Sequence, residues 1–128
     1  YLLDQNIIST AVVEVAPFLD SVRRVALVTD KTVPLRLEFN GTTVSLEAGA
    51  GEEAQATEAI DILLNGEPIS IAFNPTYLAD GLQAVGTPFV QISFTGSSKP
   101  AILMGKQEAT GPAIENYKYL LMPMRYSS

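Results

Sequence analysis

The sequence predicts an α+β fold in which a β-α-β-β-β unit occurs twice, with two packed sheets and two helices on one face. Short segments rich in Val, Ile, Leu and Phe alternate with turn signals, as in strand-rich domains. Two other segments have helical periodicity, and each follows a strand. The order of one strand, one helix and three strands covers residues 9–64 and again 69–122. Two such units predict two sheets with both helices packed on the same side.

The strand segments are separated by residues that favour turns. We expect strands at residues 9–15, 33–39, 42–48, 57–64, 69–73, 89–94, 101–104 and 117–122. Asn40-Gly41 predicts a hairpin, because both turn residues tolerate positive φ. Asn65-Gly66 repeats that signal before the strand at 69–73. The polar segment 105–116 contains Gly and Pro and predicts a loop between the last two strands.

Two segments predict helices. The first covers residues 17–28, with Pro17 in the first turn, where its missing N–H costs nothing. Its apolar residues recur at three- and four-residue spacing: Phe18, Leu19, Val22, Val25 and Ala26. The second helix covers residues 75–85, with Asn74 as N-cap and Gly86 as a stop signal.

The composition removes most kinds of catalytic site. The chain has 128 residues, which fits one domain, and it contains neither Cys nor His. Disulfides, thiolate nucleophiles, Cys-type zinc sites and Ser-His-Asp triads are therefore excluded. Composition alone thus removes most hydrolase and metalloenzyme functions. Paired carboxylates such as Glu52 and Glu58 leave acid–base catalysis as a third possibility, although no second feature marks a cleft around them.

Charge is unevenly distributed along the chain. Lys and Arg number 8 against 14 Asp and Glu, which gives a net charge of −6, whereas small nucleic-acid-binding modules are usually basic. No Lys or Arg occurs between Leu37 and Ser98. That segment predicts an anionic surface, which is either a solvated face or a surface for a basic partner. Arg23 and Arg24 form the only basic doublet, on the polar face of the first helix.

The sequence also bears on the location of the protein. No apolar stretch approaches the roughly 18 to 20 residues of a membrane span. The N-terminus has neither the basic region nor the apolar core of a signal peptide, and the absence of Cys fits a reducing cytoplasm. We therefore expect a cytoplasmic protein that does not interact with membranes. The chain does not begin with Met, so we interpret it as a piece of a longer protein.

The C-terminal segment, Tyr119-Leu120-Leu121-Met122-Pro123-Met124-Arg125, is a strand that ends in a Met-Pro-Met group. Pro123 is expected to stop ladder pairing after Met122 and to push Met124 off the sheet. Methionine suits a surface that receives several apolar ligands, although both side chains could instead fill gaps in the core.

This ending resembles the C-terminal signature of the bacterial DNA polymerase III β subunit family, the replicative sliding clamps. Ile71-Ala72-Phe73-Asn74-Pro75-Thr76-Tyr77-Leu78 resembles the Phe-Asn-x-x-Tyr entry to the second helix of that family. The resemblance covers nearly all of the chain, is strongest to clamps of actinobacterial type, and matches the third of the family's three domains. It implies that residues 1–128 form one domain of the DNA-clamp fold.

The resemblance also implies a protein that is not an enzyme and needs no metal or cofactor. In this family, three-domain chains form a head-to-tail homodimer that encircles duplex DNA and keeps the polymerase on its template. Topological linkage replaces strong phosphate binding, so an acidic protein can enclose DNA if its inner helices are basic. Polymerase and clamp-loader subunits dock through short peptide motifs in a hydrophobic pocket.

Each surface of the clamp has implied residues in this chain. The peptide-binding pocket corresponds to Asn74, Tyr77, Leu120, Met122, Pro123, Met124 and Arg125. The residues facing DNA correspond to Arg23 and Arg24, and the dimer interface to Ala26, Leu27, Glu52, Glu53 and Glu58. An alternative of a different class is a stand-alone, acidic, β-rich protein-interaction module.

Overall fold

The computed structural model describes residues 7–27, 34–48, 56–96, 99–112 and 114–124. Within these ranges the elements are, in chain order, β1 (Ser9–Glu14), α1 (Val15–Leu27), β2 (Leu35–Asn40), β3 (Thr43–Ala48), β4 (Ala56–Asp61), β5 (Leu63–Gly66), β6 (Ile69–Phe73), α2 (Pro75–Val85), β7 (Phe89–Phe94), β8 (Ala101–Lys106) and β9 (Ile114–Leu121). The strands that pair do so in antiparallel register.

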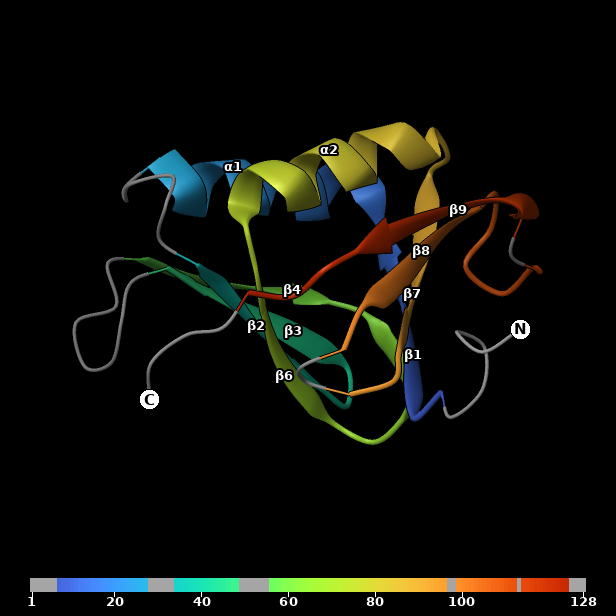
Figure 1. Cartoon of the computed structure of the whole chain (residues 1–128), viewed down its shortest axis with the longest axis horizontal. Coiled ribbons are helices and arrows are strands. Elements are labelled where there is room, and N and C mark those ends of the chain that lie inside the picture. Colours follow the sequence, from blue (N-terminus) through green and yellow to red (C-terminus); the bar gives the residue numbers. More distant parts are fainter. Residues whose placement is uncertain (1–6, 28–33, 49–55, 97–98, 113, 125–128) are drawn as a thin grey trace.

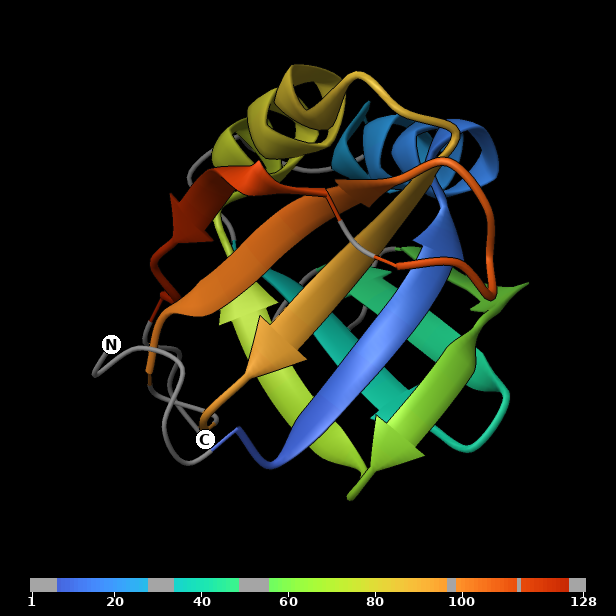
Figure 2. The same cartoon turned by 90° about the vertical axis from the view of Figure 1, so that its right-hand side faces the viewer.

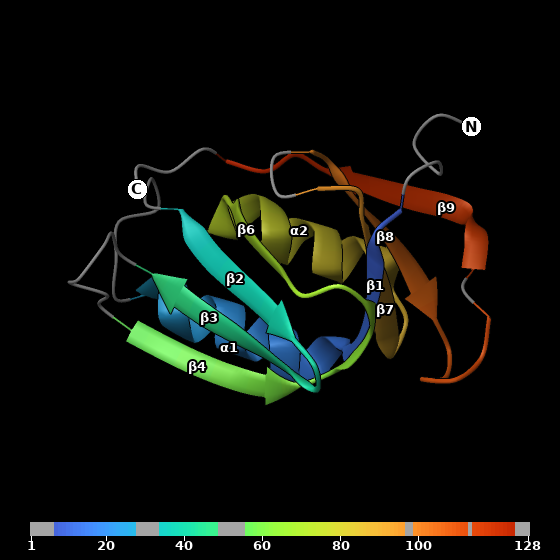
Figure 3. The ribbon, with the colours of Figure 1, turned by 90° about the horizontal axis from the view of Figure 1, so that it is seen from below.

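The strands form two sheets, and each sheet takes strands from both halves of the chain. The five-stranded sheet has the order β5-β1-β7-β8-β9 and faces the viewer in Figure 2. The four-stranded sheet has the order β4-β3-β2-β6 and is seen from below in Figure 3, with the helices behind it. The first strand of each unit thus belongs to the same sheet as the three strands that follow the helix of the other unit. The predicted α+β fold with a duplicated unit is confirmed.

The two helices lie side by side over the sheets (Figure 1). The predicted helix over 75–85 is confirmed, with Asn74 as its N-cap and Gly86 in a left-handed conformation (φ 65°) directly after it. α1 begins at Val15, so Pro17 is its third residue and still belongs to the first turn. Each helix buries one face: Phe18, Ser21, Val22 and Val25 in α1, and Pro75, Leu78, Gly81 and Leu82 in α2.

A continuous hydrophobic core fills the space between the layers. Phe39 of β2 and Phe94 of β7 pack with ring centroids 4.8 Å apart and planes tilted by 54°, which joins the two sheets. Further fully buried side chains come from both helices and both sheets: Phe18, Phe73, Leu35, Leu37, Leu46, Ile71, Leu78, Leu82, Ile92 and Leu103. This core fixes the outward faces of α1 and α2 relative to the sheet edges.

The single strand predicted at residues 57–64 is wrong. The chain leaves the four-stranded sheet after Asp61 and enters the five-stranded sheet at Leu63, with the buried Ile62 between them. The predicted Asn65-Gly66 hairpin is also wrong, because β5 and β6 lie in different sheets. Ile60, Ile62 and Leu64 keep a two-residue spacing across the change of sheet, so this spacing carries no sign of it.

The loop predicted at residues 105–116 is shorter in the structure, since β8 continues through Lys106 and β9 begins at Ile114. A Cβ atom on Gly105 would lie 2.6 Å from Oγ1 of Thr87, so the close approach of these segments requires glycine. The same hydroxyl accepts from the Lys106 amide at 3.1 Å and donates to the Phe89 carbonyl at 2.7 Å. These contacts hold β8 in the ladder where the polar composition predicts a loop.

Candidate functional site

The predicted peptide-binding residues lie where β9 ends and where β6 leads into α2. The ladder of β9 ends at Leu121, just before the Met-Pro-Met group. The Met124 amide donates to the Ala72 carbonyl of β6 at 2.7 Å. Met124 therefore leaves the five-stranded sheet, as predicted, but its backbone is held by the edge strand of the other sheet. This bond places the C-terminal segment beside Ala72, three residues before the start of α2 at Pro75.

Asn74 organises the start of α2. Its Oδ1 accepts from the backbone amides of Thr76 at 2.9 Å and Tyr77 at 3.1 Å. Its own carbonyl accepts from the Leu78 amide at 2.9 Å, the first bond of the helix. The side chain predicted to contact a peptide thus caps the helix that carries Tyr77.

Several large apolar side chains at this edge are exposed to solvent. Tyr77 and Met122 are 60% exposed and Leu120 is 45% exposed, whereas Pro123 and Met124 are half-buried. We call these five residues the C-terminal apolar surface. Arg125, which the sequence analysis assigned to the same pocket, lies outside the described residues. Adjacent exposed apolar side chains are typical of a surface that binds another molecule.

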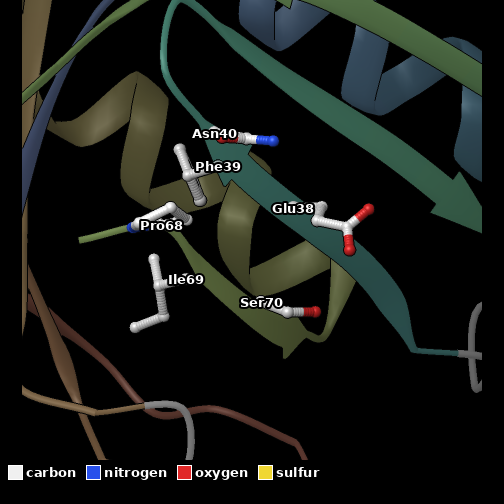
Figure 4. A pocket seen from close by; sticks show the side chains of 6 residues that line it. All are labelled: Glu38, Phe39, Asn40, Pro68, Ile69 and Ser70. Carbon is white, nitrogen blue, oxygen red and sulfur yellow. The ribbon is translucent and has the colours of Figure 1, made fainter.

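Two shallow hollows of the described residues lie elsewhere. One, of about 230 Å³, is lined by Glu38, Phe39, Asn40, Pro68, Ile69 and Ser70, from β2 and the start of β6 (Figure 4). The other, of about 200 Å³, lies beside Glu14, Asp61 and Leu63. Neither contains a residue that the sequence analysis assigned to peptide binding.

Arg24 and Glu58 were predicted to serve different surfaces, and the structure joins them. Nε of Arg24 donates to Oε2 of Glu58 at 2.9 Å, and Nη2 donates to Oε1 at 2.9 Å. Nη2 also donates to Oγ of Ser21 at 3.2 Å. This two-point contact connects α1 to β4, which is the edge strand of the four-stranded sheet.

The charges of this pair stabilise each other. The hydrogen bond from Arg24 lowers the pKa of the Glu58 carboxyl, and the bond to Glu58 raises the pKa of the Arg24 guanidinium. Ser21 adds to the lowering of the Glu58 pKa. Both groups are therefore ionised at neutral pH.

The other residues predicted to face DNA or the partner chain are exposed at the surface of α1. Arg23 is exposed, and the described residues give its side chain no ion pair. Leu27 is 83% exposed at the end of the helix, and Ala26 is half-buried. Glu52 and Glu53 lie outside the described residues.

The outward faces of the helices carry little net charge. Of the charged residues within α1 and α2, Arg23 and Arg24 balance Asp20 and Asp80. Glu58 adds a further negative charge beside Arg24. The helical layer of this chain is thus close to neutral rather than basic.

Within the described ranges, no three Asp or Glu side chains come together as metal ligands. Neither of the two described helices is long and apolar enough to cross a bilayer.

Sequence reasoning missed several residues that build these surfaces. Ser21 contributes to the Arg24 contact, and its place three residues earlier on the helix is the only signal that could have indicated it. Gly81 lies against β9: a Cβ atom there would be 2.9 Å from Cε1 of Tyr119. The Ala72 carbonyl holds Met124, and a backbone carbonyl leaves no trace in the sequence.

Comparison with known proteins identifies the family. The family model described as "DNA polymerase III beta subunit, C-terminal domain" matches residues 2–125. The chain belongs to this family. It is 52% identical over 119 residues to the beta sliding clamp of Streptomyces coelicolor, which covers 93% of this chain and 32% of that protein. It is 35% identical over 125 residues to a beta sliding clamp homolog of Streptomyces muensis, covering 98% of this chain and 34% of that protein.

Solved structures of clamps have the same fold. The DNA polymerase III beta subunit of Thermotoga maritima matches 98% of this chain and 33% of its own, with a TM-score of 0.83 and 20% identity. A DNA polymerase III subunit beta from Pseudomonas aeruginosa, solved bound to griselimycin, matches 95% of this chain and 32% of its own, with a TM-score of 0.82 and 23% identity. The chain spans about a third of the length of the relatives that it matches. The recognition made from the Met-Pro-Met ending and the Phe-Asn-x-x-Tyr helix entry is confirmed.

Proposed function

We propose that this chain is the C-terminal third of a three-domain sliding clamp, two copies of which close head to tail around duplex DNA. The ring is a non-catalytic processivity factor that keeps the replicative DNA polymerase on its template in the cytoplasm. The family match over residues 2–125 and the 52% identity to a Streptomyces clamp support this function. They do not favour a stand-alone acidic interaction module.

The C-terminal apolar surface is the proposed docking site for short peptide motifs of the polymerase and the clamp loader. The observation that carries this proposal is the exposure of Tyr77, Leu120 and Met122 at one edge, whereas the other large apolar side chains that the structure describes are mostly buried. Met side chains adapt to different apolar ligands, while Tyr77 provides a rigid wall on a capped helix. Asn74, Pro123, Met124 and Arg125 complete the proposed pocket.

The proposed ring seam uses the end of α1 and the acidic edge near β4. Leu27 is its apolar contact, because at 83% exposed it is the most exposed large apolar side chain of the described residues and stands at the end of α1. Ala26, Glu52, Glu53 and Glu58 are the other proposed seam residues. Single surface ion pairs contribute little, so Leu27 is expected to matter more than the carboxylates.

Retention on circular DNA tests the ring. The full-length protein is loaded onto a nicked circular plasmid by its clamp loader and separated from free protein by gel filtration in high salt. We expect the protein to stay with the circle and to be lost within minutes of a single restriction cut, because a topological link needs no tight phosphate contact. Retention that survives the cut, or no retention on the circle, contradicts the proposed function.

A further inference from the structure

The two neighbouring arginines of α1 have different surroundings. Successive residues of a helix are about 100° apart around its axis, so the two side chains leave α1 in different directions. The Arg24 guanidinium is directed to the edge strand β4, where it meets both oxygens of Glu58 and the hydroxyl of Ser21. Arg23 is exposed and has no ion pair with any described residue.

The Nε and Nη2 donors of Arg24 are already used by Glu58 and Ser21. A guanidinium presents its donors in a fixed planar fork, and the pair with Glu58 uses one side of that fork. A phosphate that approached this group would also meet the Glu58 carboxylate, and Asp20 lies one helical turn earlier. Arg24 is therefore a poor phosphate ligand as long as the pair is intact.

β4 is an edge strand, so it has a hydrogen-bonded neighbouring strand on one side only. It pairs with β3, and Glu58 stands opposite Leu46 in that register. Leu46 is fully buried, so the two residues share the sheet face that is turned toward α1. On this face, the Arg24–Glu58 pair thus links α1 to the edge strand β4.

We propose that the two arginines divide the work: Arg23 contacts the phosphates of the enclosed DNA, and Arg24 is a positioning residue that holds β4 against α1. The inference rests on the proposed ring function for its DNA part only. The positioning part concerns the folded chain itself and is measured without DNA.

The test compares Arg23→Gln, Arg24→Gln and Glu58→Gln in the full-length protein. The first readout is the dependence of DNA binding on salt, measured as the slope of log K against log [salt] for the unloaded protein on a short linear duplex, where no topological link holds it. The slope is negative, and each lost phosphate contact reduces its magnitude by about 0.9. Arg23→Gln is present twice in a homodimeric ring, so it is expected to reduce the magnitude by about 2. Arg24→Gln is expected to leave the slope unchanged, and Glu58→Gln, which frees the Arg24 guanidinium, is not expected to reduce its magnitude.

The second readout is hydrogen exchange of the backbone amides of β4. Arg24→Gln and Glu58→Gln are expected to raise the exchange rates of these amides at least several-fold, while Arg23→Gln leaves them unchanged. The charge-swapped double variant Arg24→Glu with Glu58→Arg is expected to restore protection, which separates the pair from a general loss of folding.

The outcomes separate this inference from the proposed function. Arg24→Gln that reduces the magnitude of the salt slope as Arg23→Gln does, with β4 protection intact, overturns the division. An unchanged slope in Arg23→Gln also overturns it. If the wild-type ring itself is not retained on circular DNA, the ring function fails, while the exchange measurement still decides the role of Arg24.

Discussion

The two helices occupy equivalent places in the duplicated unit, yet each is joined to its edge strand in a different way. α1 meets β4 through the charged pair of Arg24 and Glu58. α2 meets β9 through close apolar packing, with Gly81 against the ring of Tyr119. In each unit the strand concerned is the third after the helix and stands at the edge of its sheet. The same arrangement of helix and edge strand is thus held by a charged pair in one unit and by apolar packing in the other.

The difference follows the surfaces that the two halves present. The first half carries the arginines and the exposed Leu27, where we propose contacts with DNA and with the partner chain. The second half has no basic residue in its helix and exposes Tyr77, Leu120 and Met122. The two halves thus have the same order of elements, but the first exposes arginines and the second exposes large apolar side chains.

The largest expected effect is on the apolar contact. Gly81→Leu is expected to destabilise the fold by about 2 to 3 kcal/mol, because even a Cβ atom there lies 2.9 Å from the Tyr119 ring and 3.3 Å from Leu103. Denaturant unfolding of the full-length protein, followed by exchange at β9, measures it. Ala84→Leu, on the exposed side of α2, is the matched control and is expected to change stability by less than about 0.5 kcal/mol. Equal stability of both variants would show that α2 tolerates a wider spacing from β9.

The apolar surface itself is tested by peptide binding. Met122→Ala in the full-length protein is expected to weaken a synthetic peptide with one Gln anchor and two apolar side chains about tenfold, or about 1.4 kcal/mol. Isothermal titration measures the affinity. Leu63→Ala removes an aliphatic side chain of similar exposure (50% against 60%) from β5 and is expected to leave the affinity unchanged. Equal losses in both variants would argue against a defined site at Met122.

Ring closure gives a smaller effect. Leu27→Ala is expected to raise the dissociation constant of the dimer several-fold, by about 1 kcal/mol, while thermal unfolding stays unchanged because the side chain is 83% exposed. Sedimentation velocity over a range of protein concentrations measures the dimer. A wild-type dissociation constant in this variant would remove Leu27 from the seam.

Much of this fold follows from local pattern. The strands at 69–73 and 89–94 and the helix at 75–85 have the predicted bounds, because period-two and helical spacing are fixed by the backbone geometry of each element. The change of sheet between β4 and β5 was not predictable, since the two-residue spacing of Ile60, Ile62 and Leu64 runs across it and only long-range pairing separates the two strands.

The same holds for the sites: their local features were predictable from the sequence, and their long-range contacts were not. The Met-Pro-Met ending and the capped entry to α2 were recognisable, and Asn74 caps the helix as its residue type predicts. The bond from Met124 to Ala72 and the pair of Arg24 with Glu58 join residues far apart in the chain. The family resemblance assigned Arg24 and Glu58 to separate surfaces, and the fold brings these two residues together.

The smallest expected effect distinguishes the polar contact from the apolar one by its dependence on pH. The pKa of Glu58 is lowered in the folded chain, chiefly by the hydrogen bond from Arg24, from an ordinary value of 4.5. A lowered carboxyl pKa gives stability that is present above the ordinary value and is lost as pH falls through the folded one. Glu58→Gln is thus expected to be slightly less stable than wild type at neutral pH, and the difference is expected to shrink below pH 4.5. Salt is expected to shrink it as well, because the pair is open to solvent. Denaturant unfolding across this pH range measures the difference, with Gly81→Leu alongside. Packing does not titrate, so the Gly81 deficit should persist at every pH; a Glu58→Gln deficit that also persists would mean that shape rather than charge holds β4 to α1.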